Sequence, residues 1–196
     1  MEHNFGPACP GERIVFGAER PGFDSLSVGS AEIRQWISFM RQNGIERVCS
    51  LLPQDQLAFF DVDLLQEYRS VFGEVKVCSA PIPDRYLCDR ETLYRVVLPF
   101  LGQAERRSEP VVVHCSGGSG RTGHILAAWL VHARGFEIDE ALTAVRLPRR
   151  NPQEAVILGN ASMQDLRELL AGCATEVPPN IYERAAVKTY AVLRSD

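Results

Sequence analysis

One stretch of the sequence, residues 114–123, combines a thiol, an arginine and several glycines in a single short segment. It has the order His-Cys-Ser-Gly-Gly-Ser-Gly-Arg-Thr-Gly and follows the apolar run 111–113. Cys115 and Arg121 lie at the two ends of a loop that has three glycines between them. Glycine-rich loops can turn successive backbone N–H groups toward one point and bind an anion there. We call residues 115–121 the anion-binding loop.

The residues after Arg121 have a helical pattern, so the N–H groups of the loop should lie at a helix N-terminus, where anions are stabilised. A thiol at such a place ionises readily, with pKa values of about 3.5–7.5 in comparable sites. Cys115 is therefore predicted to be a nucleophile rather than a buried apolar thiol, the common environment of a lone cysteine. Arg121 can hold two phosphate oxygens through its planar guanidinium. Without a bound anion, a cation at that helix end would be unfavourable.

This string resembles the active-site signature of the cysteine-dependent protein tyrosine phosphatases, in which His-Cys precedes five residues, an arginine and a serine or threonine. The resemblance is closer to the small dual-specificity-phosphatase-like branch. It covers residues 80–151 through its motifs and the preceding part of the chain only through its architecture. It implies a metal-independent phosphate monoester hydrolase without a cofactor, which forms a cysteinyl-phosphate on Cys115.

The resemblance also implies roles for the residues around Cys115. Thr122 is expected to donate a hydrogen bond to the sulfur and help it leave; the alternative is an ordinary residue at a helix start. His114 is expected to shape the loop from behind by bonding to the backbone and to favour the thiolate. The substrate phosphate is expected to be bound by Ser116, Gly117, Gly118, Ser119, Gly120 and Arg121.

A general acid should protonate the leaving group, which accelerates such reactions by about 10²–10⁴-fold. In the family this acid is an aspartate on a mobile loop ahead of the cysteine. Asp84 lies 31 residues before Cys115, in a proline-rich segment that follows a predicted strand. Asp89 is the alternative, and a solvated loop aspartate without a catalytic role is a third reading. The large classical tyrosine phosphatases have a tryptophan just before the acid, and the segment directly before Asp84 has none, which favours the small dual-specificity-like branch.

A polar side chain should also orient the water that hydrolyses the phosphoenzyme. Asn151, which follows two arginines, is the candidate, and Gln153 and Gln164 are alternatives. Three arginines in this region either flank the mouth of the site and attract phosphate or belong to a solvated face: Arg146, Arg149 and Arg150.

The rest of the chain alternates strand-like and helical patterns. Strands are predicted at residues 13–17, 47–52, 74–80 and 110–115, and helices at 30–42, 90–106, 122–134, 138–147 and 161–171, the last begun by Asn160 or Ser162. A further helix should carry Leu57, Phe60, Leu64, Leu65 and Tyr68. Such alternation predicts a single α/β domain with a central, mostly parallel sheet flanked by helices. The anion-binding loop should then lie at the carboxyl edge of the sheet.

The helix predicted at 30–42 has the clearest local signals. Ser30 is expected to cap it and Gly44 to end it. Its buried face should consist of Ile33, Trp36, Ile37 and Met40. Along the whole chain we expect an N-terminal extension at 1–9, a dual-specificity-phosphatase-like catalytic domain at 10–172, and a C-terminal tail at 173–196 that either docks as a helix or frays.

Composition excludes several other classes of protein. The formal net charge of −4 argues against a surface that coats nucleic acid or membrane. The six cysteines have no zinc-type spacing, so no metal site is predicted. A catalytic thiolate needs a reducing compartment, and the N-terminal residues lack the signal-peptide pattern, so we expect a cytoplasmic protein.

The most favoured substrate is a protein carrying phosphotyrosine, with phosphoserine and phosphothreonine as further substrates, and the loop should also bind phosphate-like anions. One alternative is a phosphate-binding pseudophosphatase that acts as a scaffold without turnover. Another is a phosphatase of the same fold that acts on an inositol phospholipid or an RNA 5′-phosphate. Loops that prefer inositol phospholipids often carry lysines, and the segment 115–121 has none.

Overall fold

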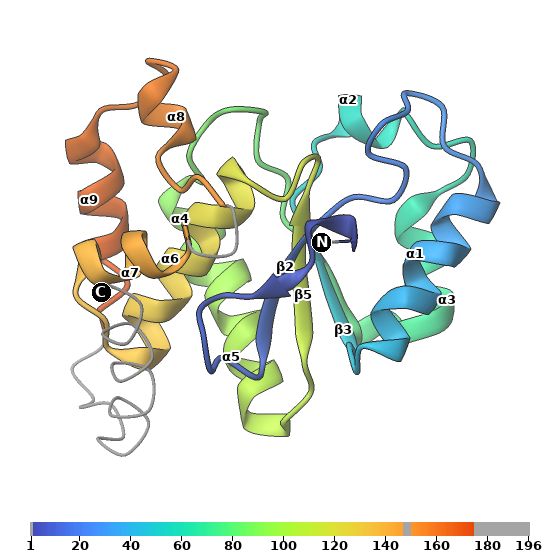
Figure 1. Cartoon of the computed structure of the whole chain (residues 1–196), viewed down its shortest axis with the longest axis horizontal. Helices are drawn as coiled ribbons and strands as arrows, with labels where there is room; N and C mark the ends of the chain where they lie inside the picture. The colour runs from blue at the N-terminus through green and yellow to red at the C-terminus, as the bar shows by residue number, and fades with distance from the viewer. Residues whose placement is uncertain (1, 147–149, 175–196) are drawn as a thin grey trace, which may run out of the picture.

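The centre of the protein is a five-stranded sheet, seen in a computed structural model that describes residues 2–146 and 150–174 (Figure 1). Its strands have the spatial order β1-β2-β5-β3-β4. The bounds are β1 Gly6–Pro7, β2 Val15–Glu19, β3 Arg47–Ser50, β4 Val77–Ser79 and β5 Val111–Cys115. Strand β1 pairs antiparallel with β2, and the other pairings are parallel. The predicted mostly parallel sheet is thus confirmed.

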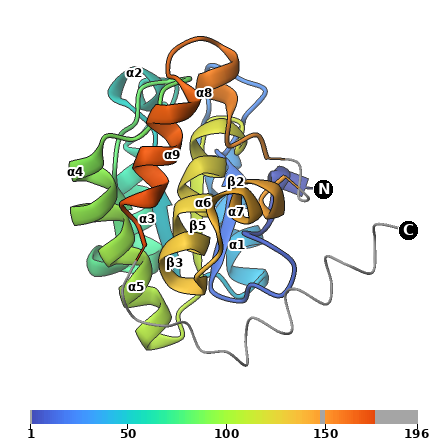
Figure 2. The same cartoon turned by 90° about the vertical axis from the view of Figure 1, so that its left-hand side faces the viewer.

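Helices cover both faces of this sheet, as Figures 1 and 2 show. One face carries α1 (Ser30–Gln42) and α3 (Leu64–Phe72), and the other carries α5 (Leu98–Arg107), α6 (Gly120–Arg134), α7 (Ile138–Ala144) and α9 (Met163–Ala171). The central strand β5 serves both layers because alternate side chains point to opposite faces. Val112 packs with α1 and α3, whereas Val111 and Val113 pack with the other helices.

The register of β5 determines where the anion-binding loop begins. Cys115, the last residue of the strand, pairs with Glu19 at the end of β2, and His114 pairs with Ser50 at the end of β3. The loop therefore leaves the carboxyl edge of the sheet between two parallel neighbours, as predicted. This is the edge at which open α/β sheets bind ligands.

The helix predicted at 30–42 is confirmed as α1, together with its buried face and its end. Gly44 has a φ of +78°, and its N–H donates to the carbonyl of Arg41. The prediction that Ser30 caps this helix is wrong. Gly29 occupies the N-cap position and no side-chain hydrogen bond closes that end, while Ser30 is the first helical residue.

The single helix predicted through residues 57–68 is two helices, α2 (Gln54–Leu57) and α3. Between them, Phe60 forms an isolated bridge with Val28, and the carbonyl of Phe59 accepts the Val28 N–H. Helix α3 then starts anew because the carboxylate of Asp63 accepts the N–H of Gln66. Tertiary pairing and a cap together overrule an apolar pattern that is continuous in the sequence.

The helix predicted at 90–106 is a continuous run of three segments: α4 (Arg90–Thr92), a π turn η3 (Leu93–Val97) and α5. Leu98 separates the π turn from Pro99, which has no N–H and whose ring would clash with a carbonyl of the preceding turn in a regular α-helix. Helix α9 begins after Ser162, which forms a capping box with Asp165, so Ser162 rather than Asn160 caps it. A short helix, α8 (Glu154–Ile157), was not predicted.

Strand and terminal predictions differ in their bounds. Strand β2 starts two residues later than expected, and β4 is preceded by a 3₁₀ turn at Glu74–Lys76. The segment expected as an N-terminal extension contributes β1 to the sheet. The tail is described only to residue 174, so its predicted docked helix lies outside the described residues. Within the described part of the chain, every helix is too short or too polar to cross a bilayer.

The carboxylate of Glu12 ties the segment before β2 to the C-terminal end of α6. Its oxygens accept the backbone N–H groups of Ile14 and Val15, the Trp129 indole N–H and two N–H groups of Arg134. Burial alone would raise the pKa of Glu12. The Arg134 guanidinium and the backbone N–H groups outweigh burial and lower the pKa below its ordinary value. Helix α6, which follows the anion-binding loop, is thereby held at its far end.

Replacing Glu12→Gln should lower the free energy of unfolding by about 3 kcal/mol at pH 7. This is the low end of the cost of removing one partner of a buried ion pair, since Glu105 still pairs with Arg134. Because the pKa of Glu12 is lower in the folded protein, its ionised carboxylate stabilises the fold at pH values above its unfolded pKa of about 4.3. This stabilisation is lost as the pH falls through the pKa of Glu12 in the folded protein. The difference between the two proteins should therefore shrink on acidification. Urea unfolding at several pH values measures it.

The matched control is Glu91→Gln, which removes an exposed i,i+4 pair with Arg95. Its expected cost is below about 0.5 kcal/mol. If the two variants were equally stable at pH 7, the stabilising role of Glu12 would be refuted.

Candidate active site

The anion-binding loop folds tightly against the end of β2. Gly118 has a φ of +66°, and a Cβ built on it would lie 2.5 Å from the backbone carbonyl carbon of Ala18. A side chain at this position would be strained in its backbone and would also collide with the neighbouring strand. Cys115, at the start of the loop, is 3% exposed. The sequence thus has a glycine, Gly118, at the point where the anion-binding loop touches the backbone of β2.

Arg20 anchors the start of the loop from beneath. Its backbone N–H donates to the Ser116 carbonyl at 2.9 Å and its Nε to Ser116 Oγ at 3.3 Å. The same buried guanidinium donates to the carbonyls of four residues that follow it: Pro21, Gly22, Phe23 and Ser25. One side chain therefore fixes both the anion-binding loop and the neighbouring loop that reaches over it.

The guanidinium of Arg121 brings the predicted acid to the anion-binding loop. Helix α6 begins at Gly120, two residues earlier than predicted, so Arg121 lies in its first turn and is only 2% exposed. Its Nη1 donates to the carbonyl of Ile82 at 3.1 Å, and its Nη2 lies 2.8 Å from Asp84 Oδ1. The Asp84 side chain is 45% exposed. Asp84 and Arg121 are thus side by side, one half-open to solvent and the other enclosed.

The alternative acid, Asp89, has a structural role. It is the N-cap of α4, and its Oδ1 accepts the Thr92 N–H at 2.8 Å. The hydrogen bonds from the backbone and side chain of Thr92 lower its pKa. This role leaves Asp84 as the aspartate that contacts Arg121.

Thr122 is the third residue of α6 and not the first helical residue as predicted. Its side chain is fully buried, and its hydroxyl has no hydrogen-bond partner among residues 2–146 and 150–174. A buried hydroxyl without a partner is costly unless it serves a ligand or a reacting group. Its proposed hydrogen bond to the sulfur is compatible with that unused donor.

His114 lies behind the loop, in the layer between the sheet and α1–α3. It is fully buried against Trp36 and Tyr68, with its Nε2 3.3 Å from the Tyr68 hydroxyl. Burial, together with the charges of Arg121 and Arg20, lowers the pKa of His114 to about 3. The ring is therefore neutral. It can shape the backbone at Cys115 but contributes no positive charge to the thiolate.

His124 was not recognised from the sequence, although a polar residue on an otherwise apolar helix is a signal for such a role. It is buried, and its Nε2 accepts the N–H of Cys88 at 3.1 Å. Burial lowers the pKa of His124 to about 4, so the ring is a neutral acceptor. It joins the first helical turns after the anion-binding loop to the end of the segment that carries Asp84.

The arginines predicted near the mouth have different environments. Arg150 is buried behind the loop, where its guanidinium donates to the carbonyls of Gly17 and Gly6 at 2.7 and 3.0 Å. Burial lowers the pKa of Arg150 to about 10, and a negative charge on Cys115 would act in the opposite direction. Both sequence readings of Arg150, mouth and solvated face, are therefore wrong. Arg146 is exposed and bonded to Gln153, and Arg149 lies outside the described residues.

The three candidates for orienting water are not equivalent. Asn151 donates its backbone N–H to Ser119 Oγ at 3.3 Å, so it contacts the loop. Gln153 is bonded to Arg146 and to the sulfur of Met163, and Gln164 is bonded to Glu168. The structure also places Glu154, which the sequence did not suggest, directly against Gly120: a Cβ built on residue 120 would overlap the Glu154 Oε2.

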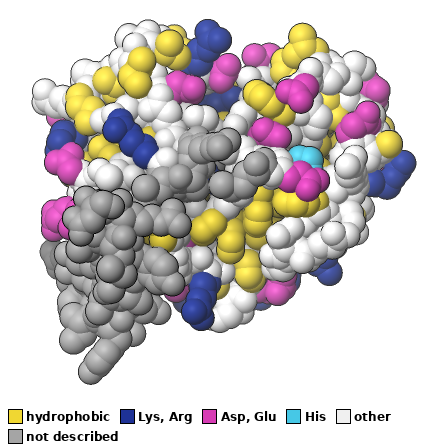
Figure 3. All heavy atoms as spheres, in the orientation of Figure 1, with side chains coloured by type: hydrophobic (Ala, Val, Ile, Leu, Met, Phe, Trp, Pro, Cys, Tyr) yellow, Lys and Arg dark blue, Asp and Glu magenta, His cyan; other side chains and the backbone are white. Residues whose placement is uncertain are grey.

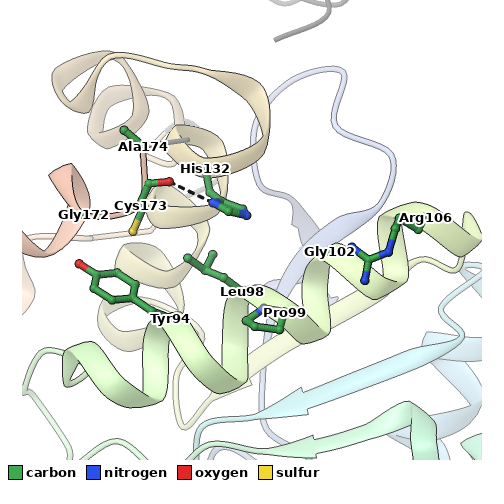
Figure 4. A pocket seen from close by; sticks show the side chains of 9 residues that line it. All are labelled: Tyr94, Leu98, Pro99, Gly102, Arg106, His132, Gly172, Cys173 and Ala174. Carbon is green, nitrogen blue, oxygen red and sulfur yellow. Dashed lines mark hydrogen bonds between the residues drawn. The ribbon is translucent and has the colours of Figure 1, made fainter. Parts of the chain in front are cut away.

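Other surface features lie away from this constellation. A cavity of about 210 Å³ lies beside Tyr94, His132 and Cys173, and His132 Nδ1 donates to the Cys173 carbonyl at 3.0 Å. Figure 4 shows the side chains that line it. No residue of the anion-binding loop lines it. On the part of the face in Figure 3 that is not covered by grey residues, acidic, basic and apolar side chains all reach the surface, and several acidic side chains lie in the upper right of the view. The predicted catalytic groups Cys115, Arg121 and Asp84 all lie at the anion-binding loop and not at this cavity.

Comparison with known families gives a match over the centre of the chain. A family model described as "Tc-R-P: Polymorphic toxin system, DSP-PTPase phosphatase" matches residues 24–135. This is more than half of the chain. The matched region includes the segment with Asp84, strand β5, the anion-binding loop and helix α6.

Among curated relatives, the Drosophila melanogaster dual specificity protein phosphatase Mpk3 is 32% identical over 74 residues, 38% of this chain and 18% of Mpk3. The Dictyostelium discoideum phosphatidylinositol 3,4,5-trisphosphate 3-phosphatase cnrN is 30% identical over 100 residues, 50% of this chain and 16% of cnrN. The chain thus aligns with less than a fifth of either relative's length.

Solved structures share the architecture over most of the chain. Tk-PTP in its active form has a TM-score of 0.62 at 23% identity, covering 86% of this chain and 99% of that protein. PTPMT1 in complex with PI(5)P has a TM-score of 0.62 at 14% identity, covering 86% and 96%. At these identities the likeness concerns the fold. With the matched family and the dual-specificity relatives beside it, the chain belongs to the DSP-PTPase phosphatases, the dual-specificity-like branch of the cysteine-dependent protein tyrosine phosphatases.

Proposed function

We propose that this protein hydrolyses phosphate monoesters through a cysteinyl-phosphate on Cys115, and that proteins carrying phosphotyrosine are its main substrates. The observation that carries the proposal is the position of the Arg121 guanidinium between the anion-binding loop and Asp84. In this arrangement a cation that can bind phosphate, Arg121, contacts a carboxyl group that can protonate the leaving group, Asp84. No metal and no cofactor takes part in the proposed reaction.

In the first step, the Cys115 thiolate attacks phosphorus, so that a sulfur–phosphorus bond forms as the bond to the leaving oxygen breaks. Asp84 protonates that oxygen. The non-bridging oxygens are bound by Arg121 and by the backbone N–H groups of Ser116, Gly117, Gly118, Ser119 and Gly120. When phosphate takes over the Arg121 guanidinium, the Asp84 carboxyl is left beside the leaving group.

In the second step, water attacks the phosphoenzyme and the thiolate departs. The Thr122 hydroxyl, which is buried without a partner in the described chain, donates to the sulfur as it leaves. Asp84 takes a proton from the water and returns to its starting state. His114 holds the backbone at Cys115 from behind.

An aromatic ring at the loop supports phosphotyrosine as the substrate. Phe23 is 44% exposed, and its Cε2 lies 3.2 Å from where a Cβ of Gly117 would be. The hydrogen bonds from Arg20 hold this segment in place. An aryl leaving group entering the loop would contact the Phe23 ring, and aromatic pairs of this kind contribute about 0.5–1.5 kcal/mol beyond area burial.

Inositol phospholipids are the second candidate substrate, because cnrN is a phosphoinositide phosphatase by name and PTPMT1 was crystallised with PI(5)P. Against them stand the absence of lysine from the anion-binding loop and the net charge of −4. A scaffold without turnover is disfavoured because thiol, guanidinium and carboxylate are all present at one place. RNA 5′-phosphates remain the least supported alternative.

The replacement Cys115→Ser should reduce kcat for an aryl phosphate by on the order of 10⁴-fold or more, since it removes the nucleophile. The assay contains EDTA and a reductant, at pH 5–8. Cys173→Ser is the control, because that thiol is buried far along the chain and should leave kcat unchanged. Turnover that survives in Cys115→Ser would refute the mechanism. A wild type that binds vanadate without turnover would support the scaffold instead.

The replacement Asp84→Asn should lower kcat by about 10²–10⁴-fold and remove the decline in rate at alkaline pH, because the amide cannot donate the proton. Asp89→Asn is the matched control, since asparagine also caps helices well and α4 should persist. The pH dependence of kcat/KM for both variants decides between the two aspartates. If Asp89→Asn flattened the alkaline limb and Asp84→Asn did not, the assignment would be reversed.

The replacement Phe23→Ala should raise KM for a phosphotyrosine peptide by about 2- to 10-fold, which corresponds to one aromatic contact. Leu26→Ala, at an exposed position on the same loop, should leave KM unchanged. The same assay with a phosphoserine peptide and with phosphatidylinositol 5-phosphate in vesicles compares the substrate classes. Faster hydrolysis of the lipid than of the phosphotyrosine peptide would favour the inositol phospholipid alternative.

A further inference from the structure

The side chain of Glu154 lies against Gly120, a residue of the anion-binding loop that has no side chain. Glu154 is the first residue of α8, and a Cβ built on Gly120 would overlap its Oε2 and lie 2.5 and 2.9 Å from its Cδ and Cβ. The glutamate side chain therefore covers the residue that directly precedes Arg121. Any side chain at position 120 would displace it.

The Glu154 carboxylate belongs electrostatically to the same site. Burial and the carboxylate of Asp84 raise its pKa, while the guanidinium groups of Arg121 and Arg85 act in the opposite direction. The side chain is half-buried, and within residues 2–146 and 150–174 its oxygens accept no hydrogen bond and form no ion pair. A carboxylate that is partly desolvated and unpaired beside a reactive loop is a candidate for a functional role.

Two of the three polar residues predicted for this role have side chains that are bonded elsewhere. The side chains of Gln153 and Gln164 are bonded to other parts of the surface, and Asn151 contacts the loop through its backbone N–H. Glu154 differs from Gln153 and Gln164 because its carboxylate lies at the loop and accepts no hydrogen bond from the described residues. It differs from Asn151 because its side chain covers Gly120.

Resting on the proposed function, we propose that Glu154 accepts a hydrogen bond from the water that hydrolyses the cysteinyl-phosphate and so orients it for attack. The water oxygen bonds to phosphorus while the sulfur–phosphorus bond breaks, and Cys115 leaves with the electron pair. One water proton passes to the Asp84 carboxylate, which lost its proton in the first step. The other hydrogen is held by Glu154 and remains on the phosphate product.

The positions of the two carboxylates allow Asp84 to accept a proton from the water while Glu154 orients it. Asp84 comes from the segment after β4 and Glu154 from α8, and both are close enough to Arg121 to interact with its charge. A water molecule with two hydrogens can thus be bonded from two sides. An oriented nucleophile reacts faster because its freedom is already restricted. A protonated Glu154 would still offer its carbonyl oxygen as an acceptor, and so would a glutamine.

Rapid-quench kinetics with an aryl phosphate tests the inference. In Glu154→Ala, the burst of phenol release should keep its wild-type rate, while steady-state kcat falls by about 10- to 100-fold, as expected for one lost hydrogen bond to a charged group. Phosphorylated Cys115 should accumulate and be detected by mass spectrometry of the acid-quenched protein. Glu154→Gln should restore kcat to within a few-fold of the wild type.

The matched control is Glu32→Ala, which removes another glutamate near a helix N-terminus that lies against a glycine, here Gly29, outside the site. It should change neither phase. Equal loss of burst and steady state in Glu154→Ala, or a Glu154→Gln variant as slow as Glu154→Ala, would overturn the orienting role. A wild type without burst or turnover would instead overturn the proposed function, so the two failures are distinguishable.

Discussion

The charge of Arg121 is the constraint on which the arrangement of the site depends. An enclosed guanidinium at the start of a helix is electrostatically unfavourable unless anions or carbonyls surround it. In this structure the Ile82 carbonyl and the Asp84 carboxylate provide those partners. The requirement to neutralise one cation therefore draws the segment after β4 over the anion-binding loop. His124 holds the end of that same segment through the Cys88 N–H.

Two further buried arginines lie behind the anion-binding loop and add positive charge there. Arg20 and Arg150 donate mainly to backbone carbonyls, which do not cancel their charge as a carboxylate would. The buried Nε of Arg150 has no hydrogen-bond partner among the described residues. The positive potential at the loop is thus generated inside a protein whose formal net charge is −4. His114 and His124, whose pKa values burial lowers to about 3 and about 4, remain neutral at physiological pH and add no competing charge.

The sequence was sufficient to predict what depends on local chemistry. The residue spacing at 114–123 predicts the loop that begins at Cys115. Apolar periodicity predicts the buried face of α1, and the alternation of strands and helices predicts the parallel sheet. Asp84 could be placed at the loop because parallel strands end at one sheet edge. Residues whose position is decided by tertiary packing could not be predicted. Arg150 reads as a surface arginine because its carbonyl partners lie more than a hundred positions earlier in the chain. Glu154 was not singled out in the sequence because only the fold places it on Gly120.

The bonds between Arg150 and the first strands have a consequence for the limits of the functional unit. The carbonyl of Gly6 accepts from Arg150, and the side chain of Asn4 donates to the carbonyl of Gly117 in the anion-binding loop. The first few residues are therefore part of the scaffold that shapes the reactive loop. Shortening the chain at its N-terminus, or reading a domain boundary after residue 9, would remove acceptors from a buried cation. It would alter the chemistry of a cysteine more than a hundred residues away.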